Sequence, residues 1–190
     1  GDVRSELNLA ESDRIVVCAA VLEERKGQAS LIEAISLLKE DLRNHIHLVL
    51  AGDGSMRADY ECLAVQLGLA NQVHFLGFRP DVWQFIKSAD VYVQPSVVDP
   101  LPRALLEAMY LEVPVVGTRI DGIPDVITQF ETGLLVKVHD AREIAEAITY
   151  SLTSSDVSAM VRRAKTRIQD GHTMEGMARQ ITKLLKKEGR

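Results

Sequence analysis

Short apolar runs alternate with longer amphipathic stretches along this chain, and the alternation constrains the fold more than any other sequence feature. Residues 15–21 form an unbroken apolar run of strand length, which is typical of a strand covered on both faces. Apolar residues then recur at helical spacing from Leu31 to Leu42. Strand and helix patterns alternate six times with short connections. We therefore expect a single α/β domain, a Rossmann-like doubly wound parallel sheet with right-handed crossovers.

The remaining pattern defines the other elements and the loops between them. Further strands are expected at residues 46–51, 73–76, 91–93, 113–118 and 133–136. Helices are expected at residues 31–42, 60–67, 82–87, 103–111, 141–152, 156–169 and 174–187. Ligands of doubly wound sheets bind beyond the carboxyl ends of the strands. The candidate loops are therefore residues 22–28, 52–55, 77–81, 94–102 and 119–125.

Charge is unevenly distributed along the 190 residues. The net charge of −5, from 22 basic and 27 acidic side chains, argues against a nucleic-acid-binding protein. Residues 160–190 nevertheless carry a net charge of +6, from nine basic and three acidic side chains. We interpret this stretch, and the helix expected within residues 174–190, either as a solvated helix face or as a peripheral membrane contact.

The two cysteines, Cys18 and Cys62, lie 44 positions apart and show neither ligand nor redox spacing. We expect both to be buried free thiols of a reducing compartment. The longest apolar run is far shorter than the about 20 residues that span a bilayer, and no signal peptide is recognised. These features predict a cytoplasmic protein, whose basic C-terminal stretch would allow contact with the inner face of the membrane.

Two candidate loops combine features that suit a phosphate ligand. Arg25 and Lys26 precede a helix N-terminus, where cations and backbone N–H groups can hold a phosphate, although a plain polar turn is the alternative. Gly52 and Gly54 begin like a dinucleotide-binding motif, but they lack its third glycine and follow the second strand, which excludes an NAD site. These glycines either let the backbone approach a ligand or simply form a tight turn.

The loop at residues 94–102 leads into a helix, and two carboxylates, Asp99 and Glu107, lie eight positions apart. Eight helical positions would span about 12 Å, which suits two parts of one extended ligand. That spacing is too long for the paired carboxylates of a glycoside hydrolase. A buried Glu107 would need a hydroxyl or cation partner, whereas an exposed one is an ordinary solvated helix residue.

The sequence contains no pattern typical of a metal site or an activated nucleophile. The five histidines show no ligand spacing, and we interpret them as structural. No G-x-S-x-G or G-K-[ST] motif occurs, and no Asp-x-Asp pair is available to hold a divalent cation on a diphosphate. We therefore expect neither a metal nor a cofactor.

Taken in order, nine short motifs resemble the C-terminal domain of the retaining glycosyltransferases of family four (group one), which have a GT-B fold. The matching stretches are residues 22–27, 31–34, 50–54, 73–77, 89–96, 99–109, 113–116, 122–125 and 132–136. The resemblance implies that residues 1–190 form the domain that binds a nucleoside-diphosphate sugar, without the N-terminal acceptor domain. Such a chain would be half of a hexosyltransferase of polysaccharide or glycoconjugate biosynthesis, inactive by itself.

The resemblance also assigns roles to individual positions. Lys26 would bind the donor diphosphate and act in catalysis, Asp99 would face the transferred sugar, and Glu107 would bind the ribose hydroxyls. Backbone groups at the helix start would face phosphate or sugar, and those of residues 75–79 would hold the edge of the base. These further donor-binding positions are Leu101, Arg103, Ala104, Leu76 and Phe78.

The chain departs from the family pattern at several positions. Ala20 and Val21 stand where the family carries a Gly-Arg pair, so one diphosphate cation is missing unless Arg25 replaces it. Asp99 is one carbon shorter than the usual Glu, Asp121 replaces a Gly and Asp125 replaces a Glu. The alternative is therefore a non-catalytic nucleotide-sugar-binding or scaffold module. An epimerase of the same fold is a further rival, whose catalytic carboxylates are not found.

Overall fold

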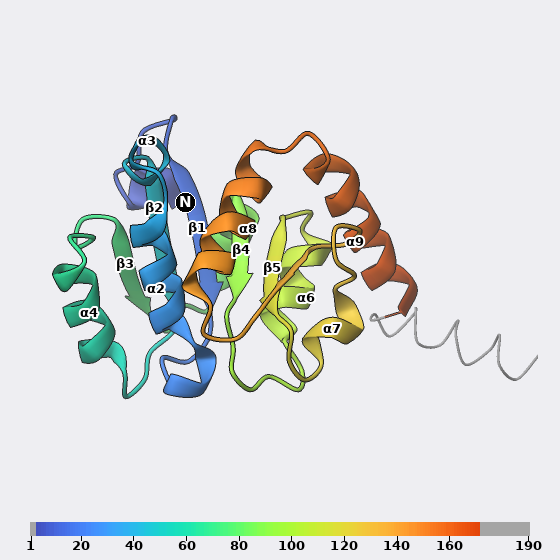
Figure 1. Cartoon of the computed structure of the whole chain (residues 1–190), viewed down its shortest axis with the longest axis horizontal. Coiled ribbons are helices and arrows are strands. Elements are labelled where there is room, and N and C mark those ends of the chain that lie inside the picture. Colours follow the sequence, from blue (N-terminus) through green and yellow to red (C-terminus); the bar gives the residue numbers. More distant parts are fainter. Residues whose placement is uncertain (1–2, 172–190) are drawn as a thin grey trace, which may run out of the picture.

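The computed structural model describes residues 3–171, which contain a six-stranded parallel sheet. The strand order is β3-β2-β1-β4-β5-β6 (Figure 1). The strands are β1 (Arg14–Ala19), β2 (Ile46–Ala51), β3 (Val73–Gly77), β4 (Val91–Gln94), β5 (Val115–Thr118) and β6 (Leu134–Val136). The order reverses direction between β1 and β4, which is the arrangement of a doubly wound sheet. The predicted fold class is confirmed.

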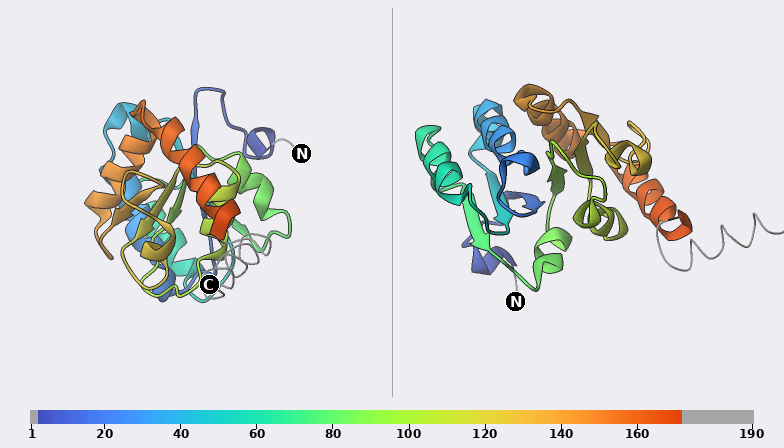
Figure 2. Two further views of the ribbon diagram at one scale, coloured as in Figure 1. Left: turned by 90° about the vertical axis from the view of Figure 1, so that its right-hand side faces the viewer. Right: turned by 90° about the horizontal axis from the view of Figure 1, so that it is seen from below.

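Helices cover both faces of this sheet. They are α1 (Val3–Glu6), α2 (Gln28–Leu37), α3 (Glu40–Arg43), α4 (Arg57–Gln66), α5 (Val82–Lys87), α6 (Arg103–Tyr110), α7 (Ile123–Val126), α8 (Ala141–Thr153) and α9 (Val157–Gly171), with a 3-10 turn at Glu24–Lys26. On one face α2 packs against both α4 and α8, whereas α6 packs against α5 and α9 on the other. The view from below in Figure 2 shows the two helix layers on either side of the strands.

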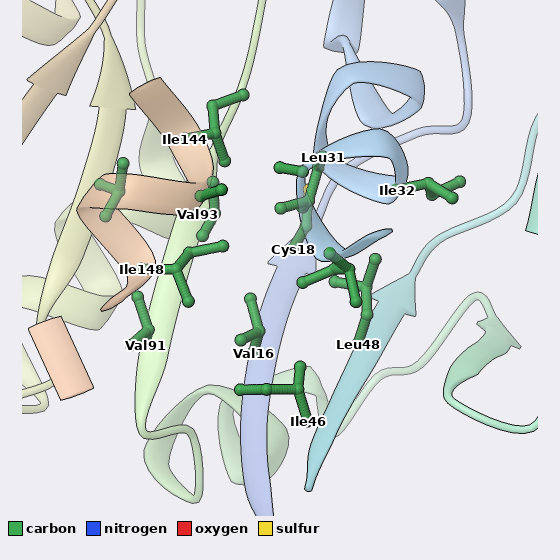
Figure 3. Close-up of a cluster of buried hydrophobic side chains, with 14 of the residues drawn as sticks. Val16, Cys18, Leu31, Ile32, Ile46, Leu48, Val91, Val93, Ile144 and Ile148 are labelled. Atoms are coloured by element: carbon green, nitrogen blue, oxygen red, sulfur yellow. The ribbon is translucent and has the colours of Figure 1, made fainter. Parts of the chain in front are cut away.

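Alternate residues of the central strands enter two separate apolar cores. Val16 of β1 points toward α2 and α8, where it joins the cluster that contains Leu31 and Ile148 (Figure 3). Val17 belongs to the opposite cluster, together with Leu105 of α6. All five side chains are fully buried. Because both faces of β1 are covered, its sequence is a continuous apolar run instead of an alternating one.

Element bounds differ from the sequence prediction at several places. β1 ends at Ala19, two residues before the apolar run does, because Val21 already lies in the wall of a cavity. The short helices α1 and α7 and the 3-10 turn were not predicted, since a single turn carries no readable helical period. The single helix expected at residues 31–42 is wrong, because the backbone is extended at Leu38 and divides it into α2 and α3. The helix expected at residues 174–187 lies outside the described residues.

The two cysteines occupy different environments, and the expectation that both are buried is wrong for Cys62. Cys18 lies in the core, where burial raises the pKa of its thiol to about 12. Cys62 is exposed on α4, and its sulfur accepts a hydrogen bond from Gln66 one turn later. α4 buries only Tyr60 and Ala64, so most of its circumference faces solvent. The helical pattern of the sequence alone does not show that Cys62 lies on the solvent-facing side of α4.

Part of the basic charge near the C-terminus has a structural role. Arg163 of α9 donates a hydrogen bond to the carbonyl oxygen of Glu131, and Arg167 donates to that of Asp125. These contacts tie α9 to α7 and to the segment between α7 and β6. Within residues 3–171, no helix combines the length and apolar character needed to cross a bilayer.

Candidate functional site

A cavity of about 640 Å³ opens at the carboxyl ends of β1, β2, β3 and β4. It lies where the strand order reverses, which is where doubly wound sheets bind their ligands. Its wall is drawn from within residues 19–26, 51–53, 78–82 and 94–107. Four of the five loops that the sequence singled out therefore meet here, and the loop at residues 119–125 does not line the cavity.

Gly27 fixes the turn that follows β1. Its φ is +69°, and a Cβ atom at this position would lie 2.0 Å from the carbonyl oxygen of Pro95, so only glycine fits. The N–H group of Val97 donates to the carbonyl oxygen of Arg25 (2.8 Å) and ties the same two loops together. The β1–α2 turn is thus held against the β4–α6 loop, and Lys26 reaches the cavity wall.

Lys26 and Asp99 form an ion pair in the cavity wall. The Nζ atom of Lys26 lies 2.9 Å from Oδ2 of Asp99, and the two side chains are only 12% and 6% exposed. The same oxygen accepts hydrogen bonds from Nε2 of Gln94 (2.8 Å) and from Oγ of Ser96 (3.0 Å). These donors offset the desolvation of a buried carboxylate. The two predicted catalytic residues therefore contact each other.

Two further hydrogen bonds hold Gln94 and Asp99 in place. The hydroxyl of Tyr92 donates to Oε1 of Gln94 (2.6 Å), which directs the amide NH₂ group of Gln94 toward Asp99. Burial raises the pKa of Tyr92 well above its usual range, so the hydroxyl remains a donor. The N–H group of Asp99 donates to Oδ2 of Asp121 (2.8 Å). Asp121 has a φ of +45°, a left-handed conformation that Asp tolerates better than most residues.

Helix α6 brings the second predicted carboxylate to the cavity. Glu107 is exposed and lines the wall, so it does not bear the cost of burial. α6 begins only at Arg103, so the spacing expected for eight helical positions from Asp99 does not apply. The N–H group of Arg103 donates to the carbonyl oxygen of Leu101 (2.9 Å) and is already engaged. The hydrogen bonds among residues 3–171 leave the N–H group of Ala104 without an acceptor.

The loops after β2 and β3 form the opposite part of the wall. Gly52 lines the cavity at a φ of +148°, and a Cβ atom there would lie 2.0 Å from the carbonyl oxygen of residue 20. Gly54 lies outside the wall, packed against the backbone of Leu22. Phe78 lines the cavity and is 83% exposed, whereas the side chain of Leu76 packs against the apolar core.

The cations of the wall differ in their partners. Lys26 pairs with Asp99, and Arg79 pairs with carboxylates outside the wall. Arg103 also lines the cavity and has no ion pair within residues 3–171. Arg25, the suggested substitute for the missing family arginine, does not line the cavity, and its guanidinium pairs with Glu23 (2.6 Å). Arg103 is therefore the unpaired cation of the described wall.

Sequence reasoning did not identify the buried donors Tyr92, Gln94 and Ser96. A signal was present at Gln94, because a polar side chain at the end of a strand buried on both faces needs a partner. The partner is Asp99, five residues later.

No group of three or more His, Cys, Asp or Glu side chains in residues 3–171 is placed to hold a metal ion. His47 and His74 contact each other through ring nitrogens 2.9 Å apart, near the amino ends of β2 and β3. Burial lowers the pKa of both rings. This pair lies at the opposite end of the strands from the cavity, which supports a structural role.

A parallel sheet with charged residues around a cavity at its switch point defines a ligand-binding domain of the doubly wound α/β class. Within that class, the chain belongs to the group 1 glycosyltransferases, because the family model "Glycosyl transferases group 1" matches residues 2–168. The resemblance to the group one glycosyltransferases, stated from the sequence motifs, is confirmed.

Individual relatives agree with this assignment. The lipopolysaccharide core biosynthesis glycosyltransferase LpsE of Rhizobium meliloti is 34% identical over 145 residues, covering 76% of this chain and 41% of LpsE. The crystal structure of Anabaena Alr3699/HepE in complex with UDP and glucose matches with a TM-score of 0.84 and 26% identity, covering 97% of this chain and 51% of HepE. The structure of WaaG, a glycosyltransferase involved in lipopolysaccharide biosynthesis, matches with a TM-score of 0.79 and 26% identity, covering 87% of this chain and 45% of WaaG. The chain thus spans about half the length of the curated relatives it matches.

Proposed function

We propose that this chain is the donor-binding half of a retaining glycosyltransferase, which takes a hexose from a nucleoside-diphosphate sugar. The observation that carries the proposal is the switch-point cavity, whose wall contains Lys26, Asp99, Arg103 and Glu107. The family assignment and the UDP and glucose in the HepE structure support this class of donor. Retention of configuration is the outcome that the family resemblance implies.

The diphosphate of the donor would lie between Lys26 and the start of α6. Lys26 and Arg103 supply positive charge there, and the open N–H group of Ala104 adds a donor at a helix N-terminus. The leaving diphosphate gains negative charge as the glycosidic bond breaks. Groups fixed in advance around it stabilise the transition state more than the ground state. Lys26 is the leading catalytic residue in this proposal, and no metal is required.

The remaining wall residues would hold the two ends of the donor. Glu107 would accept hydrogen bonds from the ribose hydroxyls, and Asp99 would face the transferred sugar. The loop of residues 75–79, including the backbone at Leu76, would hold the edge of the base, and the exposed ring of Phe78 is available to stack on it.

The acceptor would bind to the part of the protein that the relatives have and this chain does not match. Positioning of an acceptor can supply about 7–11 kcal/mol of a barrier. We therefore expect this chain by itself to bind a donor without transferring its sugar.

One observation favours a second candidate, a nucleotide-sugar-binding module without transfer activity. Val21 lines the cavity, at the position where the family resemblance implies an arginine. Transfer would need Arg103 to replace that cation, whereas binding alone would not. A transfer assay on a protein that joins this domain to its acceptor half separates the two: glycosylated product supports the transferase, and donor binding without product supports the module.

The role of Glu107 gives the test of the proposed site. Glu107→Ala is expected to weaken UDP binding about tenfold to 150-fold, the effect of losing a hydrogen bond to a charged group. The wild-type chain should prefer UDP to 2′-deoxy-UDP, and the variant should lose this preference. Calorimetric titration with both nucleotides measures the two effects.

Glu33→Ala is the matched control, because Glu33 is also an exposed glutamate on a helix but lies outside the cavity wall. It should leave both affinities unchanged. A Glu107→Ala variant that still distinguishes UDP from 2′-deoxy-UDP would rule out the ribose contact.

A further inference from the structure

Gln94 lines the cavity, and the residue is only 2% exposed. A buried amide is costly unless its polar atoms have hydrogen-bond partners. Both polar atoms of the Gln94 amide have partners: Oε1 accepts a hydrogen bond from Tyr92, and Nε2 donates hydrogen bonds to Asp99 and to Ser96. Gln94 thus connects the buried hydroxyl of Tyr92 to the carboxylate that holds Lys26.

The donors on Asp99 converge on one oxygen atom. Oδ2 lies 2.9 Å from Nζ of Lys26, 2.8 Å from Nε2 of Gln94 and 3.0 Å from Oγ of Ser96. If Lys26 turns toward a ligand, the buried carboxylate keeps two neutral donors. Without Gln94, Asp99 would depend on Lys26 for much more of its stabilisation, because an unsatisfied buried charge is costly.

We propose that Gln94, oriented by Tyr92, is a positioning residue that allows Lys26 to exchange Asp99 for the donor diphosphate. Asp99 is the counter-ion of Lys26 in this structure and becomes available to the sugar after the exchange. The diphosphate step rests on the proposed function. The inference that Gln94 weakens the Lys26–Asp99 pair does not rest on the proposed function, so it can be tested without ligand.

The first experiment measures how much the Lys26–Asp99 ion pair contributes to the stability of the chain without ligand. Lys26→Met is introduced into the wild type and into a Gln94→Met variant, whose side chain has a similar length. We expect Lys26→Met to lower the urea midpoint more in the Gln94→Met background, because Oδ2 of Asp99 then loses two of its three donors and keeps only Ser96. Equal losses in the two backgrounds would overturn the proposal. If Gln94→Met does not fold, Ser96→Ala, which removes another donor to the same oxygen, replaces it with the same expectation.

The second experiment compares UDP with uridine by calorimetry. Gln94→Met should lower the affinity for UDP about fivefold, the effect of one buried hydrogen bond, and leave uridine binding unchanged. In an Asp99→Asn background the loss should disappear, because the neutral side chain no longer retains Lys26.

Two results of this calorimetric experiment would also overturn the proposal: an equal loss for uridine, which indicates a merely structural role, or a loss that persists in Asp99→Asn. If the wild-type chain binds no UDP, the proposed function fails, and the urea experiment alone decides the role of Gln94.

Discussion

Replacing Gly27 with alanine is expected to lower the free energy of unfolding by about 2–5 kcal/mol. The left-handed φ of +69° costs an L-residue about 1–2 kcal/mol. The added Cβ would lie 2.0 Å from the carbonyl oxygen of Pro95, and relieving such a clash adds about 1–3 kcal/mol. UDP binding should be lost as well, because Lys26 precedes this turn. Urea unfolding followed by circular dichroism measures the stability.

Gly68→Ala is the matched control for this variant. Gly68 has a φ of +72°, but a Cβ there would meet no atom within 4 Å. The Gly68→Ala variant should therefore lose only the conformational contribution to the free energy of unfolding, about 1–2 kcal/mol. Equal losses at the two positions would show that Gly27 is not pressed against Pro95.

Replacing Lys26 with alanine is expected to weaken UDP binding about 100-fold and uridine binding less than about threefold. The variant loses a cation at the diphosphate and also leaves the charge of Asp99 unpaired beside it. Uridine carries no phosphate, so it should not respond to either change. Calorimetric titration of the variant with both ligands gives the two ratios.

Arg25→Ala tests whether any cation of this turn has the same effect. Arg25 is adjacent in sequence, but it is exposed, pairs with Glu23 and lies outside the cavity wall. Its replacement should change the UDP affinity less than about twofold. Equal losses of UDP and uridine binding in Lys26→Ala would place Lys26 away from the phosphates.

The sequence predicts the sheet well because both faces of its strands are covered, so that runs such as residues 15–21 are continuously apolar. It predicts local detail less well. β1 ends at Ala19, since the last apolar residues of the run serve the cavity and not the sheet. The exposure of Cys62 was not predictable either, because α4 buries so few of its residues that its helical period does not define one face.

The location of the site was predictable from topology, and the candidate residues came from the family motifs. The contacts among them were not predictable. Spacing along the chain does not show that Lys26 and Asp99, which are 73 positions apart, share an ion pair. It also does not show that Arg25 turns toward Glu23, or that Arg103 is the cation left unpaired in the described wall. These outcomes depend on side-chain directions in the turn at Glu24–Lys26 and at the start of α6.

The most direct test of the central claim is a ligand-observed NMR titration of the 190-residue chain with UDP, ADP and GDP, each with and without a chelator. We expect weak binding of at least one nucleoside diphosphate, displacement by the corresponding nucleoside-diphosphate sugar, and no change on adding the chelator. Failure of all three nucleotides to bind would contradict a donor site in this cavity, and binding that disappears with the chelator would contradict a site in which Lys26 and the start of α6 neutralise the diphosphate.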